Sequence, residues 1–203
     1  MTRDRTISIL FMIGSACFAL GAVPGYAGAV GVPADGVTFF VGSVFFTTAA
    51  LGLFLQSDRA GGRQRRDRDW WAAAVQLAGT LFFNVSTLLA LAASLSTAQQ
   101  DRLVWRPDAY GSACFLVSSA VSLTTVPGGW RSWRPHDRPW WIAMLNMTGS
   151  VAFGASAVAS YVVPDSGVPR NAALVNIGTC TGALCFLLGA YLLLPRHDPV
   201  SAW

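Results

Sequence analysis

The sequence contains no lysine and no glutamate, so its cationic side chains are Arg and its acidic side chains are Asp. Only 12% of the 203 residues are charged and 53% are apolar, whereas roughly 25% of the residues in a soluble domain are charged. This shortage of charge excludes an ordinary soluble domain. The high apolar content excludes an intrinsically disordered chain, which needs low hydrophobicity and high net charge.

Charge is also missing from the interior of six long apolar stretches, which approach the ~20 residues that a helix needs to cross a bilayer. These stretches are residues 7–23, 37–56, 70–96, 110–126, 140–163 and 172–194. Pro and Gly cluster between them, for example at Pro24-Gly25 and Pro127-Gly128, where helices are expected to end. The sequence therefore predicts an all-α membrane protein with six transmembrane helices in a single domain, residues 1–203.

The distribution of Arg predicts the orientation of these helices. Eleven of the 14 Arg residues fall at the termini or in the linkers after the second and fourth stretches, and only Arg102, Arg106 and Arg170 fall on the other side. Cytoplasmic loops carry an excess of Arg and Lys. We therefore expect a multi-pass protein of the bacterial inner (plasma) membrane with both termini in the cytoplasm.

The lack of Asp, Arg and His inside the six stretches bears on function. Proton relays, ion-coupled transporters and voltage sensors use ionisable side chains at membrane depth. Buried acid–base catalysis also needs such groups. The sequence contains no HExxH, GxSxG, P-loop or GxGxxG motif, each of which would indicate a specific chemistry. No cofactor is expected.

A short motif recurs in the apolar stretches. Five of them carry Gly-[Ser/Thr]-x-x-Phe, and the sixth carries a near match; the motifs run from Gly14 to Phe18, Gly42 to Phe46, Gly79 to Phe83, Gly111 to Phe115, Gly149 to Phe153 and Gly182 to Phe186. A small residue follows seven positions after each Gly. Offsets of 0, 4 and 7 share one helix face. Small residues let membrane helices approach closely, so the stripe predicts helix packing. The alternative is that the stripe binds a cofactor, but the motif occurs on every helix, which favours packing.

Longer correspondences group the helices in pairs. The segments Asp69-Trp70-Trp71 and Arg138-Pro139-Trp140-Trp141 both lead into an apolar stretch. The simplest interpretation is three tandem helical hairpins, residues 6–57, 70–126 and 140–194, joined by Arg-rich cytoplasmic linkers. An even number of spans in each unit makes these parallel repeats.

The first hairpin resembles the YrhK-like small integral membrane proteins. The resemblance lies in the segment from Ile13 to Phe18 and the segment from Phe39 to Phe46, each with Gly-Ser-x-x-Phe in an apolar helix. The later hairpins look like more diverged copies. The resemblance implies an integral membrane hairpin. It implies no established activity, so no functional residue is carried over.

Amides and hydroxyls are the strongest polar groups within the predicted helices. Gln76, Thr80, Asn84 and Thr87 fall at offsets of 0, 4, 8 and 11 on one face of the third helix, and Asn146 lies in the fifth. Interhelical hydrogen bonding is one interpretation of these residues. The other is that Gln76, Thr80, Asn84 and Asn146 line a site for a small uncharged or amphipathic ligand.

Acidic residues lie at the predicted outer ends of the hairpins. Asp35, Asp108 and Asp165 could converge into an acidic ring that binds a cation. The alternative is that they serve in turns and helix caps. On the cytoplasmic side, His136 and Asp137 are adjacent, but their spacing matches no known metal site.

Three classes of function follow. The leading hypothesis is a non-enzymatic structural or accessory membrane protein that binds a lipid or a membrane-protein partner, or self-associates, through its helix faces. The second is a channel or transporter for a small neutral or amphipathic solute. The third is an interfacial enzyme that uses His136, Asp137 or an outer Asp. The Arg-rich linkers are small and juxtamembrane, so nucleic-acid binding is not expected.

Overall fold

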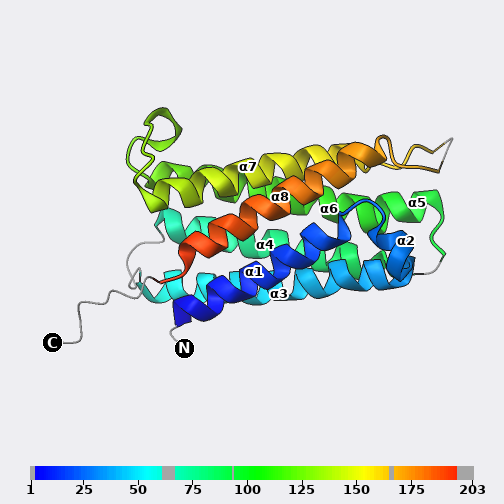
Figure 1. Ribbon diagram of the computed structural model, residues 1–203, viewed down its shortest axis with the longest axis horizontal. Coiled ribbons are helices and arrows are strands. Elements are labelled where there is room, and N and C mark those ends of the chain that lie inside the picture. Colours follow the sequence, from blue (N-terminus) through cyan, green and yellow to red (C-terminus); the bar gives the residue numbers. More distant parts are fainter. Residues whose placement is uncertain (1–2, 61–66, 93, 165–166, 196–203) are drawn as a thin grey trace.

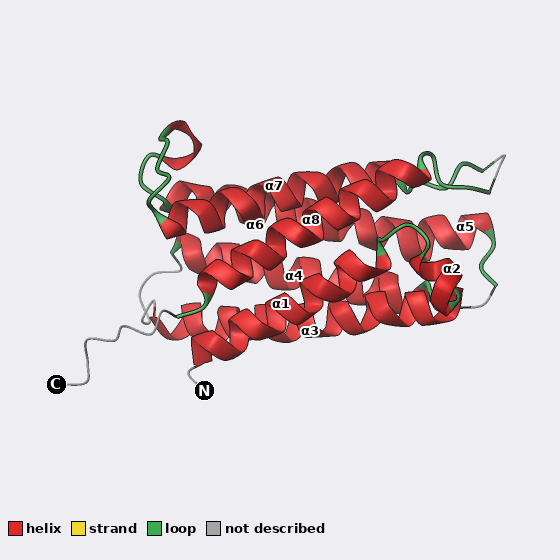
Figure 2. Cartoon of the chain, viewed as in Figure 1, coloured by secondary structure: helices red, strands yellow, loops and turns green. Residues whose placement is uncertain are grey.

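A computed structural model describes residues 3–60, 67–92, 94–164 and 167–195. The described chain is a bundle of long helices (Figures 1 and 2). The long helices are α1 (Arg3–Gly21), α3 (Val32–Ala60), α4 (Arg68–Leu89), α6 (Arg106–Thr125), α7 (Arg138–Ala159) and α8 (Ala172–Leu193). Shorter helical segments are α2 (Tyr26–Val30), α5 (Thr97–Gln99), the π-helical turn η1 (Gln100–Trp105) and the 3₁₀ turn η2 (Gly129–Arg131).

Five of these helices are long and apolar enough to cross a membrane: α1, α3, α4, α7 and α8. The chain is therefore an all-helical protein with membrane-type helices. α6, which corresponds to the predicted span 110–126, is not among the five. Its 20 residues include four Ser and two Thr, and its first turn contains Arg106 and Asp108, so its mean hydropathy is lower.

The six long helices form a closed ring. Each packs mainly against two others, in the order α1, α3, α4, α6, α7, α8 and back to α1. Neighbours in the ring run in opposite directions, and α1 begins at the same end of the bundle at which α8 ends (Figure 1). This end, where α1, α4 and α7 begin, is called the basic end below because Arg3, Arg68 and Arg138 lie there.

The chain departs from the predicted third span, residues 70–96, because α4 ends at Leu89. Residues 90–92, 94 and 95 are not helical, and Ser96 starts the next helix instead. Ser96 Oγ accepts a hydrogen bond from the backbone N–H of Gln99, and Gln99 Oε1 accepts one from the backbone N–H of Ser96. This capping box fixes a new helix start that hydropathy alone does not reveal.

The motif glycines mark the closest approaches between paired helices. A Cβ added to Gly14 would lie 2.9 Å from the backbone oxygen of Gly42, and one added to Gly42 would lie 3.1 Å from that of Gly14. The same reciprocal approach occurs between α4 and α6 at Gly79 and Gly111, and between α7 and α8 at Gly149 and Gly182. These positions have no room for a side chain, so the stripe acts in helix packing.

The Phe of each motif points to the middle of the ring. Together they form a cluster, here called the phenyl core, of Phe18, Phe46, Phe83, Phe115, Phe153 and Phe186. The rings from α1, α4 and α7 form one triangle with centroids 5.9–6.2 Å apart. Those from α3, α6 and α8 form a second, at 5.4–6.0 Å. The two triangles touch at 5.2–6.3 Å, within the range of favourable aromatic pairs.

Candidate functional site

The phenyl core closes the axis of the bundle. The small space among its rings, Ser43 and Thr80 is too small to hold a water molecule. Each of the six rings is at most 7% exposed. Larger cavities lie on both sides of this constriction, and all six long helices line them. The axis is therefore filled only at its middle.

The cavity away from the basic end has a volume of about 560 Å³ and is called the Asp108 cavity. Phe18 of the phenyl core is part of its floor, and Trp105 and Asp108 are part of its wall. Hydroxyl and amide side chains complete the polar lining: Ser86, Thr87, Ser94, Gln100, Ser156, Ser160 and Thr179. The volume lies in the range of about 300–1,000 Å³ that is typical of small-molecule sites.

Asp108 is also part of a smaller recess that reaches down to the phenyl core. The recess is lined by Phe18, Phe83 and Phe153, the triangle from α1, α4 and α7, together with Ser112, Ser156 and Thr179. A carboxylate and three aromatic rings therefore share one recess. Ser156 and Thr179 bond to each other across α7 and α8, with their hydroxyl oxygens 2.8 Å apart.

The π-helical turn η1 positions the wall of the Asp108 cavity. Its wider winding leaves the carbonyl of Val104 to accept a hydrogen bond from Ser86 Oγ at 2.9 Å. Trp105 Nε1 donates to the backbone oxygen of Ala157 at 2.8 Å, and its ring packs on Tyr161 with centroids 5.0 Å apart. These bonds tie η1 to α4 and α7. Single π-helical turns are frequent at functional sites.

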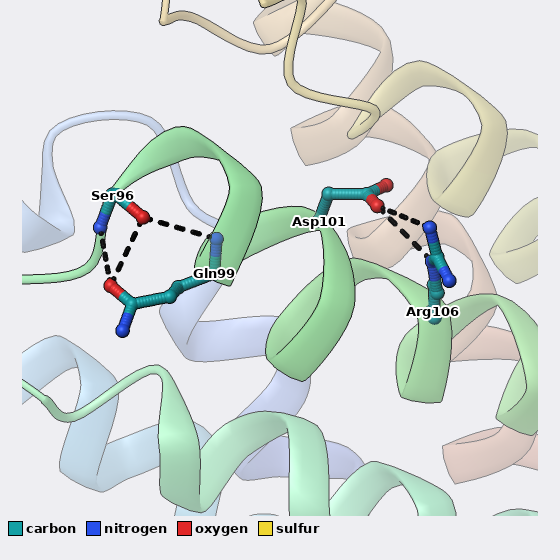
Figure 3. A network of polar contacts seen from close by, with 4 residues as sticks. All are labelled: Ser96, Gln99, Asp101 and Arg106. Carbon is teal, nitrogen blue, oxygen red and sulfur yellow. Dashed lines mark hydrogen bonds and ion pairs between the residues drawn. The ribbon is translucent and has the colours of Figure 1, made fainter.

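A polar network holds the start of η1 (Figure 3). Ser96 and Gln99 form the capping box before it. The Arg106 guanidinium donates to Asp101 Oδ2 through Nη2 at 2.9 Å and through Nε at 3.1 Å. Arg106 is thus already paired across η1. Asp101 and Arg106 do not line the Asp108 cavity.

Two adjoining cavities lie on the other side of the phenyl core, toward the basic end. Their volumes are about 560 and 350 Å³, and they share Leu53, Gln76, Ser122 and Leu193. The larger one reaches the bundle end at Asp4, Asp67 and Asp69. The smaller one contacts the phenyl core at Phe46 and Phe186.

The structure separates the four ligand residues predicted from the sequence. Gln76 and Asn146 come together as lining of the 350 Å³ cavity. Thr80 is 1% exposed, donates to the backbone oxygen of Leu77 at 2.8 Å and borders the phenyl core. Asn84 lines none of these cavities, and its buried Oδ1 has no hydrogen-bond partner among the described residues. The polar face of α4 therefore follows the axis through Gln76, Thr80 and Thr87, without Asn84.

The predicted acidic residues are likewise placed apart. Asp35 lies in the first turn of α3 and is not part of the Asp108 cavity. Its Oδ1 is buried without a partner in the described part of the chain. Asp165 lies outside the described residues. No group of three or more His, Cys and Asp among the described residues is placed to hold a metal ion.

Of the residues proposed for an interfacial enzyme, His136 and Asp137 line none of the cavities, whereas the outer residue Asp108 does. His136 is exposed at the basic end, and Asp137 precedes α7 without a side-chain cap bond. Sequence reasoning named Asp108 as a candidate cation ligand in an outer acidic ring, but did not predict that it lines a cavity. The signal was present, because Pro107 is well suited to the first turn of a helix and would have extended the predicted span back across Asp108.

No known family model matches the chain, and neither a curated protein nor a solved structure matches it. The cavities and the groups that line them are therefore the basis for assigning a function.

Proposed function

We propose that all six long helices cross a lipid bilayer as three hairpins, α1–α3, α4–α6 and α7–α8, and that the basic end lies in the cytoplasm of a bacterial cell. Two observations support this topology. Arg3, Arg5, Arg68, Arg131, Arg134 and Arg138 belong to the basic end, whereas Arg102, Arg106 and Arg170 belong to the other. Cytoplasmic loops carry such an excess.

The outward faces of the helices support the same proposal. Val44, Leu81, Val151 and Leu184 each lie two positions after a motif Gly and are 42–55% exposed. These side chains point away from the ring, whereas the motif residues point into it. Large exposed apolar surfaces on a bundle indicate contact with membrane or with another protein. Three diverged copies of a YrhK-like hairpin would produce this pattern.

We further propose that the bundle is a channel or transporter for small amphipathic solutes, with the phenyl core as its closed constriction. The observation that carries this proposal is the pair of chambers on one axis, on opposite sides of six packed Phe rings, in which polar side chains interrupt a mainly apolar lining. Hydrophobic constrictions gate channels by excluding water. A solute would enter one chamber, and displacement of the rings would open the way to the other.

The cavities favour this function over a purely structural role. Helix association alone requires no cavities. Here cavities of about 560 Å³ on one side, and of about 560 and 350 Å³ on the other, lie next to a tightly packed centre and are partly open to the outside, so that a solute could enter them. An accessory role would instead depend on the outer faces, where nothing in the structure specifies a partner.

Proteoliposomes test the proposed transport. The full chain would be reconstituted, and entry of glycerol and of ethidium measured against protein-free liposomes. We expect faster entry of at least one probe, and a decrease in the Gln76→Leu variant because Gln76 lines both basic-end cavities. Asn84→Leu is the matched control, since Asn84 lies on the same helix but lines none of the three cavities. Equal entry with and without protein would refute transport of these solutes.

Reporter fusions test the topology separately. Alkaline phosphatase is active only outside the cytoplasm, so we expect activity for a fusion after Thr97 and none for a fusion after Arg131. Activity of the second fusion would overturn the orientation without affecting the transport result.

A further inference from the structure

The Asp108 cavity contains an acidic group that the protein itself does not neutralise. Within the described parts of the chain, no Arg or His side chain lines this cavity. The nearest Arg in sequence, Arg106, is paired with Asp101. Residues two apart on a helix do not face each other, so Arg106 and Asp108 point in different directions. Burying a carboxylate without a counter-charge is costly, so Asp108 needs a cation or a proton from outside.

The surroundings of Asp108 determine what kind of cation would fit. Phe18 and Trp105 line the 560 Å³ cavity together with Asp108, whereas the recess that also contains Phe83 and Phe153 has only about 30 Å³ and is too small for an organic ligand. Aromatic faces attract cations through their quadrupoles, most strongly when the site excludes water. The remaining lining is mainly apolar, with Phe39, Leu95, Val104, Val162 and Val175. A small hydrated metal ion would leave this apolar surface unused, whereas an organic cation would cover it.

We propose that the Asp108 cavity binds a singly charged organic cation with apolar substituents, such as an alkylated ammonium or phosphonium, and that Asp108 is its counter-ion. The rings of Phe18 and Trp105, which line the cavity together with Asp108, contact the ligand near its cationic centre, and the apolar wall contacts its substituents. This inference deepens the proposed transport function, because it names the class of solute, and it rests on that function only for the passage step.

The volume of the cavity agrees with this ligand class. About 560 Å³ accommodates a drug-sized molecule. Hydroxyls at Ser112, Ser156 and Thr179 lie beside the carboxylate in the recess. Ser112 and Ser156 donate to backbone oxygens and Thr179 bonds to Ser156, so these hydroxyls can accept a hydrogen bond from a polar substituent of the ligand. The single charge of the site selects for single positive charge, because a second cationic group would be desolvated without a partner.

Equilibrium dialysis with tetraphenylphosphonium tests the proposal directly. The full chain would be purified in detergent micelles, and protein-free micelles would give the background partitioning of the probe. We expect saturable binding at one site per chain and a loss of at least about tenfold in affinity for Asp108→Asn, which removes the charge and keeps the shape. Asp108→Glu keeps the charge and should retain most of the affinity. A monodisperse size-exclusion peak for each variant would show that the fold is intact.

Tetraphenylborate, which has the same shape and the opposite charge, is the matched control probe. Weak binding of tetraphenylborate that does not change in Asp108→Asn would support the proposal. Equal affinity for both probes, or an unchanged affinity for tetraphenylphosphonium in Asp108→Asn, would overturn it, as would complete absence of tetraphenylphosphonium binding.

The binding assay and the flux assay fail independently. Binding that depends on Asp108, without entry of either solute into proteoliposomes, would preserve the cation site and refute transport. Entry of solute without Asp108-dependent binding would preserve transport and refute the cation site.

Discussion

Arg106 Nη2 lies 2.9 Å from Asp101 Oδ2. Asp108, which follows Arg106 by two residues, instead lines a cavity that contains no cationic side chain from the described residues. Two neighbouring acidic groups therefore have opposite roles. Asp101 accepts two hydrogen bonds from Arg106 through one oxygen, Oδ2, in a surface pair that holds the start of η1 (Figure 3). Asp108 is left to an external positive charge.

This difference predicts opposite consequences for two identical substitutions. Asp101→Asn should lower the free energy of unfolding by less than about 1 kcal/mol, because exposed ion pairs contribute little. It should leave tetraphenylphosphonium affinity within about twofold of the wild type, whereas Asp108→Asn should abolish most of it. Equilibrium dialysis of both variants in parallel gives the comparison. An equal loss of affinity in both would mean that only the general negative charge of this end attracts the probe.

The reciprocal glycine contacts predict a strong effect of one added methyl group. Gly149→Ala would place a Cβ 3.0 Å from the backbone oxygen of Gly182 and from the Phe186 ring. The Gly182 oxygen is part of the α8 backbone and cannot shift without moving the whole helix, so α7 and α8 must separate. Overpacking of this kind costs about 1–3 kcal/mol. We expect a fall in thermal midpoint of several degrees, measured in detergent by loss of the monodisperse size-exclusion peak.

Gly28→Ala is the matched control for this substitution. Gly28 lies within the short helix α2, and a Cβ added there would meet nothing within 4 Å. Its thermal midpoint should equal or slightly exceed that of the wild type, because Ala favours the helical conformation over Gly. If Gly149→Ala were as stable as Gly28→Ala, the close packing of α7 and α8 would be wrong.

The repeated motif allowed the inner face of each helix to be predicted from the sequence. Offsets of 0, 4 and 7 depend only on helical periodicity, and the residues at these offsets are the ones that meet in the structure. The Ser or Thr after each motif Gly, as at Ser15, Ser43 and Thr80, is at most 3% exposed. The meeting of all six Phe at one level was not predicted, because the relative height of the helices depends on loops and tertiary packing.

Asp108 was named from the sequence as a candidate cation ligand, but the cavity that it lines was not predicted, for a related reason. Hydropathy placed the start of the span at Tyr110, so Asp108 was assigned to a loop, and Trp105 was not considered. The π-helical turn joins α6 and carries both residues into the wall of a cavity. Such a turn has no clear sequence signal. Asn84 shows the converse difference. It lies at an offset of 8 from Gln76 and was therefore assigned to the same polar face, but it lines neither of the two cavities that Gln76 lines.

A buried serine pair predicts a measurable contribution of hydrogen bonding between α6 and α7. Ser150 Oγ lies 2.8 Å from Ser119 Oγ and 3.1 Å from the backbone oxygen of Phe115. Hydrogen bonds between membrane helices contribute about 0.6 kcal/mol on average and up to about 1.7. Ser150→Ala should lower stability by this amount, measured by unfolding in mixed micelles.

A double-mutant cycle distinguishes this bond from a general effect of losing a hydroxyl. Ser119→Ala combined with Ser150→Ala should cost less than the sum of the two single changes, because both remove the same interaction. Thr124→Val provides the comparison on an exposed site, where the hydroxyl bonds only to its own helix at Val121. Strict additivity of the Ser changes would show that the pair is not coupled.

The phenyl core predicts how the closed state can be opened by mutation. Phe115 is 1% exposed and contacts Phe46, Phe83, Phe153 and Phe186, so Phe115→Ala would remove a ring that packs against four of the other five in the cluster. The variant should be destabilised by about 3–5 kcal/mol and should admit water between the two chambers. In proteoliposomes we expect glycerol entry several-fold faster than for the wild type.

Phe82→Ala is the control on the outer face of the same bundle. Phe82 is 38% exposed and contacts Tyr110, with ring centroids 5.7 Å apart. Because it lies outside the phenyl core, its loss should leave glycerol entry unchanged. Phe115→Leu should give intermediate entry, since Leu refills part of the volume without restoring the ring contacts. If Phe115→Ala folded as a monodisperse protein and glycerol entry remained at the wild-type rate, the phenyl core would not be the constriction, and the two chambers would be separate sites without a path between them.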